Sequence, residues 1–531
     1  MSHNYNDIPV GVLTVQKLSR SCCPQLRWKK ETIFKASTFV LTYLAYTCYH
    51  MSRKPISVVK SVLHTNCSES VVHNTSSNDC GYAPFDDANA PALFAALDSA
   101  FLFSYAAAMF VSGFVAERVS LRYFLAFGMI FSGVFSYLFG MAKTWNLHAM
   151  SFFIFVQVCA GITQTTGWPG VVALIGRWFG KSKRGLVFGI WNSHTSIGNI
   201  LGTLIAAQYV EKDWALSFIM PGIIIASVGF ILFLFLVDCP EMVGCYPEAT
   251  GITDRSPPND SDIEEENTNY DAVSVMKGLL PHNSNIYFSF SFQEINYRPS
   301  ERTPILDNRS ATHNAHAERP IGLKDALRIP GVIEFSLCLF FSKLVSYTFL
   351  YWLPLYIQSS STLGPELSAD LSILFDVGGI FGAIVAGMIS DMSGMSATTC
   401  MVMLFLASPV LLVYQAYGAT SVFVSVFLLI VAGFLVNGPY ALITTSVSAE
   451  LGQHSSLEGN AKALATVTAI IDGTGSIGAA VGPLMAGMIS SGGWQNVFYM
   501  LIVSDFIAML LLVRLVKKEC TRVTRSRIRI E

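Results

Sequence analysis

Apolar segments of about 20 residues recur along this sequence, and they constrain its fold more than any other feature. A helix needs about 20 apolar residues to cross about 30 Å of hydrocarbon. Six such segments lie on each side of a polar interval, at 36–60, 92–116, 121–142, 149–176, 184–209 and 216–238, then at 331–358, 367–391, 397–417, 420–447, 461–489 and 496–516. The sequence therefore predicts an all-α integral membrane protein with about twelve transmembrane helices in two six-helix lobes.

The composition argues against several other classes of protein. Charged residues make up 13% of the 531 residues and hydrophobic residues 52%, whereas a soluble chain has about 25% charged residues. The net charge of −2 gives no basic field that would attract nucleic acid. The eleven cysteines form neither a C-x-x-C motif nor a Cys/His ligand spacing, so we expect no metal ion or other cofactor.

The predicted domain organisation follows from where polar residues gather. The first 34 residues are polar and basic rather than a signal peptide, so the first apolar helix should be retained. The central polar interval contains SPPNDSDIEEENTNYDA, a composition typical of a disordered linker. We expect a tail at 1–34, a lobe at 35–238, a linker at 239–330, a lobe at 331–516 and a basic tail at 517–531.

Lysine and arginine mark alternate loops, and this pattern sets the predicted orientation. They gather in both tails, after the second and fourth helices and in the central linker, so these parts should face the cytosol. The loop at about 61–91 contains neither lysine nor arginine and should face the lumen or the exterior. It contains glycosylation sequons at Asn66 and Asn74, and Cys67 and Cys80 could form a disulfide there.

The two halves repeat short motifs at a constant spacing. Ser-Ile-Gly occurs at 196–198 and again at 476–478, and Trp214 matches Trp494 at the same offset of 280 residues. Parallel six-helix repeats are typical of two-lobed transporters that rock around a central site. The repeat therefore favours a transporter.

Several motifs resemble those of known transporters. The turns at 113–117 (GFVAE) and 387–391 (GMISD) resemble the loop signature of the major facilitator superfamily. YTCYHMSRK at 46–54, TGWP at 166–169 and FSKLVSYTFLYWLPLY at 341–356 resemble the organophosphate:phosphate antiporters and, within them, the sugar phosphate exchanger family. The resemblance implies the major facilitator fold and exchange of glucose 6-phosphate for inorganic phosphate, typically across the endoplasmic reticulum membrane.

Arg53 is the first candidate for a substrate contact. A guanidinium at bilayer depth costs about 2.5 to 3.5 kcal/mol on insertion scales, so it needs a compensating role. One alternative ends the helix at Met51 and lets Arg53 extend to the lumenal headgroups, against the positive-inside bias. The resemblance implies bidentate contact with a substrate phosphate, which the planar guanidinium suits. Tyr46, Tyr49 and His50 share its helical face, and they either contact the substrate or bond to other helices.

Lys343 is the corresponding cation of the second half, and Tyr347 lies one turn further along the same predicted helix. A lysine in mid-helix either binds the substrate or pairs with a carboxylate such as Asp376. The antiporters have the basic residue of their seventh helix at the position of Ser346. That position is one turn from Lys343, so the two share a helical face and differ in depth.

The other pocket candidates come from the fourth and fifth predicted helices. His194 resembles a histidine of bacterial members, shifted by one residue, and it either contacts the substrate or bonds across helices. Asn192 would help to fix the sugar. Trp168 either walls the pocket or packs at a kink formed by the Gly-Trp-Pro motif. Met109 stands where bacterial relatives have a lysine, which would leave fewer cations for phosphate.

Asp98, Asp376 and Asp472 are our candidates for functional carboxylates within the membrane. Such carboxylates form proton relays in pumps, and they also pair with buried cations. The sequence leaves both roles open. By resemblance, three further residues are predicted to make gating contacts at the cytosolic helix ends: Glu117, Arg118 and Asp391.

The predicted mechanism is alternating access, with Arg53 and Lys343 clamping a phosphate between the lobes. An empty site with two unpaired cations in a low dielectric would resist the closed state, which favours obligate exchange. One alternative is a proton- or ion-coupled symporter of sugars or organic anions that uses the aspartates. Another is a receptor or scaffold without transport. No enzymatic motif is evident, and the expected partners are the bilayer and a small anion rather than nucleic acid.

Overall fold

A computed structural model describes the chain outside residues 1–7, 23–29, 65–80, 88, 117, 180–190, 246–322, 452–460 and 529–531. The chain divides into one unit of Met1–Pro247 and Glu318–Glu531 and a second unit of Glu248–Ala317. The second unit covers most of the predicted linker and lies outside the described residues. The first unit is helical in all of its described elements.

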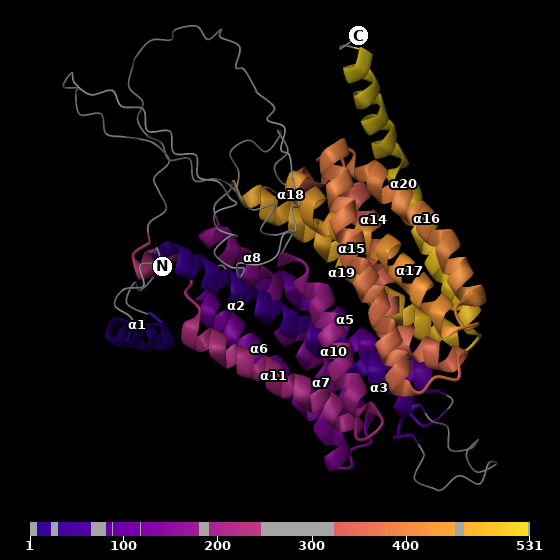
Figure 1. The fold of residues 1–531 in the computed structure, drawn as a ribbon, viewed down its shortest axis with the longest axis horizontal. Coiled ribbons are helices and arrows are strands. Elements are labelled where there is room, and N and C mark those ends of the chain that lie inside the picture. The colour runs from indigo at the N-terminus through magenta and orange to yellow at the C-terminus, as the bar shows by residue number, and fades with distance from the viewer. Residues whose placement is uncertain are drawn as a thin grey trace. The chain divides into compact units, whose positions relative to one another are not determined.

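The N-terminal half makes six membrane passages within the described residues, two of them broken into helix pairs (Figure 1). A shorter helix, α1 (Val10–Cys22), precedes them. In chain order the passages are α2 (Lys30–Arg53) with α3 (Pro55–Leu63), α5 (Ala90–Ala116), α6 (Leu121–Thr144), α7 (Met150–Gln164) with α8 (Gly167–Trp178), α10 (His194–Val210) and α11 (Trp214–Phe235).

The C-terminal half makes six more passages in the part of the chain that the structure describes. Two short helices, η2 (Pro240–Val243) and α13 (Leu323–Leu327), lie at the edges of the linker. The passages are α14 (Val332–Ser360), α15 (Pro365–Ser393), α16 (Ser396–Tyr417), α17 (Val422–Leu442) continued by the π-helical η3 (Ile443–Val447) and α18 (Ser448–Leu451), α19 (Ala461–Ser490) and α20 (Trp494–Ile528). The predicted twelve helices are thus present.

Nine of the described helices are long and apolar enough to cross a membrane by themselves. Two of the other three passages are interrupted, and the third is described only from Trp191 onward. Helices α2 and α3 part at Lys54, α7 and α8 part at Thr165 and Thr166, and α10 has 17 residues. All three passages carry candidate site residues. Polar residues and kinks at a site weaken the apolar signal of the helix that carries them.

The predicted tails contain helix. Helix α1 falls within the predicted N-terminal tail, and α20 continues to Ile528 through the predicted basic tail. Glu519 of α20 accepts hydrogen bonds from the backbone N–H groups of Ala397 and Thr398, both at 2.9 Å. This carboxylate caps the first turn of α16, which has unpaired N–H groups. The extension of α20 is therefore tied to the C-terminal lobe.

The repeated Ser-Ile-Gly motif makes equivalent contacts in the two lobes. A Cβ added at Gly198 in α10 would lie 2.5 Å from the carbonyl oxygen of Thr47 in α2. A Cβ added at Gly478 in α19 would lie 2.0 Å from the carbonyl oxygen of Phe340 in α14. Each glycine lets two backbones approach closely, as small residues do in membrane proteins. The helices with Arg53 and Lys343 are therefore each held by the same kind of partner.

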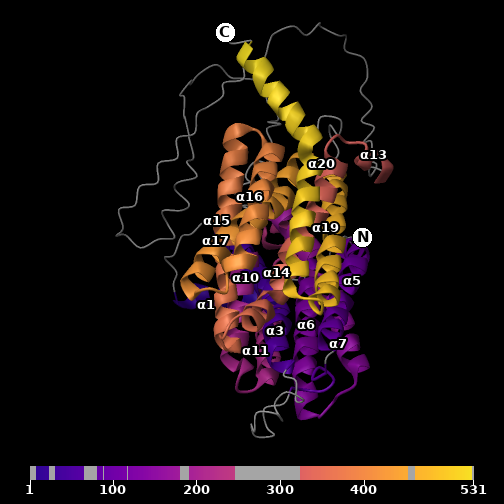
Figure 2. The ribbon, with the colours of Figure 1, turned by 90° about the vertical axis from the view of Figure 1, so that its right-hand side faces the viewer.

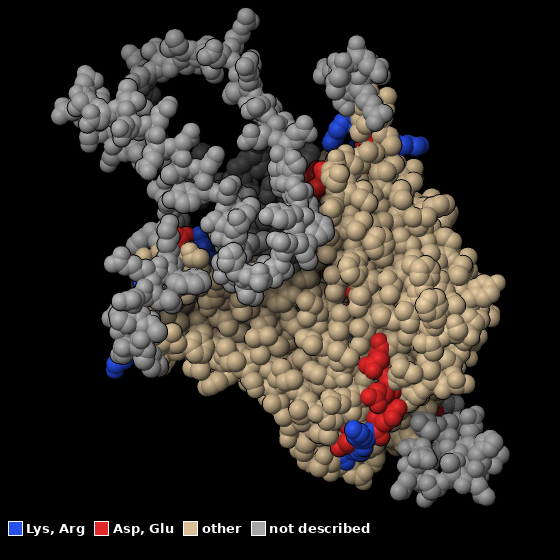
Figure 3. All heavy atoms as spheres, in the orientation of Figure 1, with Lys and Arg blue, Asp and Glu red and all other residues tan. Residues whose placement is uncertain are grey.

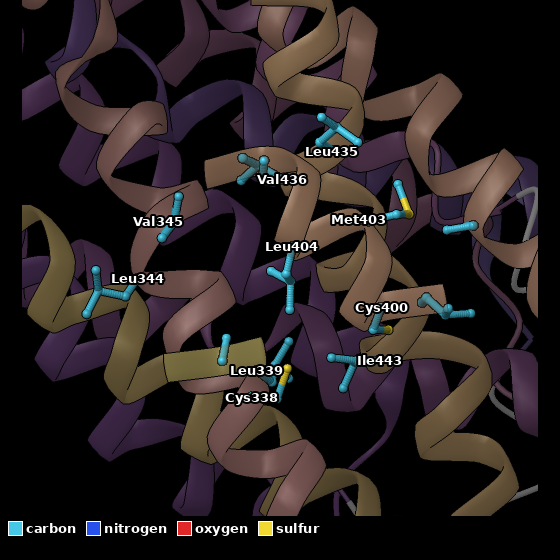
Figure 4. Close-up of a cluster of buried hydrophobic side chains, with 14 of the residues drawn as sticks. Cys338, Leu339, Leu344, Val345, Cys400, Met403, Leu404, Leu435, Val436 and Ile443 are labelled. Carbon is cyan, nitrogen blue, oxygen red and sulfur yellow. The ribbon is translucent and has the colours of Figure 1, made fainter. Parts of the chain in front are cut away.

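Each lobe has an apolar interior and an apolar outer face. Figure 4 shows the interior of the C-terminal lobe, where side chains from α14, α16 and α17 meet, among them Leu339, Leu404 and Val436. Phe405 and Phe423 instead point outward, with 63% and 82% of their surface exposed. Few charged side chains interrupt the face visible in Figure 3. Such a surface suits contact with lipid rather than water.

The lobes meet along α5 and α19 and along α10 and α15 (Figures 1 and 2). The closest contacts lie toward the helix ends opposite the two termini, which we call the loop end. There a Cβ added at Gly487 in α19 would lie 2.3 Å from the Cβ of Ala95 in α5. The Glu211 carboxylate, just after α10, accepts a hydrogen bond of 3.3 Å from the backbone N–H of Glu366 in α15. The loop end is therefore closed.

Candidate functional site

The break in the first passage lies directly after Arg53. Helix α2 ends at Arg53, and α3 begins at Pro55, which fits a first helical position because its missing N–H is not needed there. The exposed fraction is 7% for Arg53 and 2% for Lys54, so both cations lie inside the protein. The alternative in which the helix ends at Met51 and Arg53 reaches the headgroups is therefore wrong.

Arg53 is held by an amide and by aromatic rings. Its Nε donates to Oε1 of Gln164 at 2.6 Å, and Nε2 of Gln164 donates to Oγ of Ser52 at 3.0 Å. The guanidinium carbon lies 4.8 Å from the ring centroid of Tyr105 and 5.8 Å from that of Phe101. The described residues give Arg53 no carboxylate partner. A cation positioned in this way can accept an anionic ligand.

The other candidates of the N-terminal lobe gather around Tyr46. Its ring centroid lies 5.3 Å from that of His50, 4.4 Å from that of His194 and 5.7 Å from that of Trp168. The hydroxyl groups of Tyr49 and Thr166 are 2.8 Å apart. The buried Nδ1 of His50 and Nε2 of His194 have no hydrogen-bond partner among the described residues. The cluster therefore keeps polar atoms available for a ligand.

Lys343 and Tyr347 bring the C-terminal lobe to the same site. Lys343 is buried, its Nζ donates to Oδ1 of Asp472 at 2.7 Å, and it lies 5.5 Å from the ring centroid of Tyr440. Tyr105 and Tyr347 lie within electrostatic range of both Lys343 and Arg53. The two cations thus approach one polar region from different lobes.

Lys343 thus pairs with a carboxylate, which was one of the two alternatives, but the partner is Asp472 and not the suggested Asp376, which pairs with a different lysine. Asp376 lies 3.7 Å from Nζ of Lys54 and accepts a hydrogen bond of 2.9 Å from Nδ2 of Asn199. Lys54 and Asn199 belong to the N-terminal lobe and Asp376 to the C-terminal lobe. This group of three side chains therefore connects the two lobes and is not part of the substrate region.

Asp98 also lies at the contact between the lobes. Its Oδ2 accepts a hydrogen bond of 2.5 Å from Nζ of Lys60, and neither side chain is exposed. Lys60 also donates to the carbonyl oxygen of Tyr351 at 3.1 Å and lies 4.2 Å from the ring centroid of Trp352. Of the three candidate aspartates, Asp472 is the one beside Lys343.

The structure describes three of the remaining candidates and leaves five undescribed. Asn192 is partly buried just before α10, while Arg118 and Asp391 are exposed near the ends of α5 and α15. Five candidates lie outside the described residues: Glu117, Asn66, Asn74, Cys67 and Cys80.

Several residues of these polar groups were not identified from the sequence, among them Lys60, Gln164, Tyr105 and Tyr440. Lys60 carried a signal, since it lies seven residues after Arg53 in the same passage and is a charge at bilayer depth. Gln164 directly precedes the Thr-Thr-Gly-Trp-Pro run, but a single glutamine is a weak signal. Tyr105 and Tyr440 gave none, because a tyrosine within an apolar segment has many ordinary roles.

Comparisons with known proteins agree with this architecture. The profile of the Major Facilitator Superfamily matches residues 42–457. Two solved structures share the fold: a bacterial homolog of the human lysosomal transporter Spinster in an inward-facing, unoccupied conformation (TM-score 0.55, 14% identity, 92% of this chain and 95% of that chain) and the D-xylose-proton symporter (TM-score 0.57, 13% identity, 90% and 97%).

Curated sequences give a narrower assignment. The chain is 52% identical over 500 residues to the glucose-6-phosphate exchanger SLC37A2 of Homo sapiens, which covers 93% of this chain and 94% of that protein. It is 46% identical over 544 residues to the glucose-6-phosphate exchanger SLC37A1 of Mus musculus, with 96% of both covered. The chain therefore belongs to the Major Facilitator Superfamily and, within it, to the sugar phosphate exchanger family.

Proposed function

We propose that this protein exchanges glucose 6-phosphate for inorganic phosphate by alternating access. The observation that carries the proposal is the position of Arg53, a buried cation without a carboxylate partner among the described residues. A second cation, Lys343, reaches the same region from the other lobe. The names of the relatives at about 50% identity support the choice of substrates.

In this proposal the phosphate group binds between the lobes. Arg53 makes a bidentate contact with two phosphate oxygens, since the amide of Gln164 fixes the guanidinium plane. Lys343 contributes a point charge from α14. The sugar hydroxyls are bound by the other candidates: Tyr46, Tyr49, His50, His194, Tyr347, Trp168 and Asn192.

Alternating access requires that only one end of the site be open at a time. The closed loop end supports a state in which the site opens toward the termini. The positive-inside pattern supports cytosolic termini, so this state is inward-facing in our proposal. We further propose the endoplasmic reticulum membrane as the location, with glycosylation of Asn66 and Asn74 and a Cys67–Cys80 disulfide on the lumenal side.

The pairing of the three candidate aspartates favours exchange over proton coupling through them. Asp98, Asp376 and Asp472 each have a lysine partner within 4 Å. Pairing of this kind neutralises buried charge, a structural role that needs no proton transfer.

Transport in proteoliposomes tests the proposal. Purified protein is reconstituted into vesicles that are loaded with phosphate or left empty, and uptake of labelled phosphate and glucose 6-phosphate is measured. We expect uptake by the wild type to require internal phosphate. Arg53→Ala should reduce uptake at least 100-fold, because a charge-assisted bidentate contact is worth about 3 kcal/mol or more.

Arg514→Ala is the matched control, since Arg514 is 72% exposed and pairs with Glu334 far from the cluster. It should transport like the wild type. Uptake that follows a pH gradient and does not depend on Arg53 would refute the proposal and favour the ion-coupled alternative.

A further inference from the structure

We propose that Asp472 is a resident counter-anion of the substrate site. An incoming phosphate must replace Asp472 as the partner of Lys343. Asp472 would then set the affinity of the carrier for phosphate. This inference rests on the proposed function, because it assigns a role within the same site.

The buried cations of the membrane region differ in how they are neutralised. Lys54, Lys60 and Lys343 each pair with an aspartate, whereas Arg53 has no carboxylate partner in the described part of the chain. Arg53 can therefore receive an anion directly. Lys343 can do so only when its hydrogen bond of 2.7 Å to Asp472 is broken.

The Lys343–Asp472 pair is the most accessible of the three buried pairs. Its side chains are 5% and 14% exposed, compared with 0% and 0% for Lys60–Asp98 and 2% and 7% for Lys54–Asp376. A ligand that enters the central region from water can reach the Lys343–Asp472 pair. The other two are covered by the contact between the lobes.

The surroundings of Asp472 allow its carboxylate to be released. Its backbone is fixed within α19, where the main-chain oxygen accepts a hydrogen bond of 2.9 Å from Ser476 Oγ. The hydrogen bonds of its carboxylate within the described residues go to Lys343 alone. Tyr440 lies beside the pair, with its ring centroid 5.5 Å from Nζ of Lys343. Phenol groups can donate to a carboxylate that has lost its lysine.

The charges of the empty site follow from this pairing. Arg53 and Lys343 contribute two positive charges and Asp472 one negative charge, so the site as a whole is singly positive. A bound phosphate brings a second anion beside Asp472, and like charges in a low dielectric repel. Asp472 therefore weakens phosphate binding and at the same time keeps the empty site from holding two unpaired cations.

A double-mutant cycle on Asp472 and Lys343 tests this role. Binding of inorganic phosphate is measured on purified full-length protein in nanodiscs, and KM and kcat are measured in phosphate-loaded proteoliposomes. Asp472→Asn should lower the Kd and the KM for phosphate about tenfold or more, since the competing charge-assisted hydrogen bond is gone. The kcat should not rise, because tighter binding slows release.

Two further variants separate competition from a merely structural contact. Asp472→Glu keeps the charge and should keep the Kd within about threefold of the wild type. Lys343→Met leaves Asp472 to repel the phosphate, so it should bind phosphate more weakly than the double variant Lys343→Met/Asp472→Asn. This last comparison does not depend on whether Asp472→Asn alone folds.

The outcomes distinguish the two proposals. If the wild type binds phosphate, Arg53→Ala abolishes binding and neither asparagine variant binds more tightly than its parent, the role of Asp472 is refuted and the proposed function stands. If the wild type binds neither phosphate nor glucose 6-phosphate, the proposed function itself fails.

Discussion

At the scale of single residues, the buried ion pairs are the feature whose loss should cost the most stability. Lys60 and Asp98 have no exposed surface, and their contact is a hydrogen bond of 2.5 Å. Removal of one partner leaves a buried charge without compensation, which costs about 3 to 5 kcal/mol. Removal of both partners is far less costly, because no charge is stranded.

Asp98→Asn should therefore destabilise the protein strongly, and Lys60→Met/Asp98→Leu should restore most of the loss. The measurement is the melting temperature of detergent-solubilised protein, followed by size-exclusion chromatography after heating. Lys143→Met is the control, because the Lys143–Asp213 pair is about 40% exposed and should contribute no more than about 1 kcal/mol. An Asp98→Asn variant as stable as the wild type would contradict the importance of this pair.

At the scale of helices, close backbone contact between α14 and α19 holds the second half of the site together. A Cβ at Gly478 would lie 2.0 Å from the carbonyl oxygen of Phe340, a backbone atom that cannot yield without moving the helix. Gly478→Ala should therefore separate the two helices and lower stability by about 1 to 3 kcal/mol, as overpacking does. The melting temperature measures this effect.

Gly387→Ala is the matched control for Gly478→Ala. Both glycines lie within helices of the C-terminal lobe, but a Cβ at Gly387 meets no atom within 4 Å. The control should be neutral or slightly stabilising, since alanine favours helix. Equal losses at the two positions would mean that the α14–α19 contact has no special role.

The sequence predicted the helical passages far better than it predicted which side chains pair between them. Apolar length is a local property, so all twelve passages could be assigned, and even the close α14–α19 contact had a signal in the repeated Ser-Ile-Gly motif. Ion pairing depends on which helices are neighbours. Lys60 and Asp98 are 38 residues apart, and Lys343 and Asp472 are 129 apart, so no local pattern identifies these partners. Arg53 could be singled out from the sequence because an arginine at bilayer depth is rare in itself, and the structure buries it, while its contact with phosphate stays a prediction.

At the scale of the whole membrane unit, the two lobes are joined by polar contacts that exist only while the loop end is closed. Asp376 of α15 contacts Lys54 and Asn199 of the N-terminal lobe, with distances of 3.7 Å and 2.9 Å. These contacts must separate whenever the lobes rock apart at that end. They therefore stabilise one of the two states that alternating access requires, and their strength sets the population of the other.

Asp376→Ala should shift the population toward a state that is open at the loop end. Residues 211 and 366 report this opening, because Glu211 of one lobe contacts the backbone of Glu366 in the other. Spin labels at Glu211→Cys and Glu366→Cys, in a background without other cysteines, give the distance between the lobes by pulsed electron resonance. We expect a short distance in the parent protein and an added population at longer distance after Asp376→Ala.

Asp213→Asn is the control for this measurement, since Asp213 lies at the same end but pairs with Lys143 of its own lobe. It should leave the distances unchanged. An unchanged distribution in Asp376→Ala would mean that apolar contacts such as that of Ala95 with Gly487 suffice to close the loop end. Asp376→Ala also leaves Lys54 buried without its partner, which destabilises the closed loop end. A shift toward the open state in Asp376→Ala alone would therefore mean that a charge between the lobes controls access to the site.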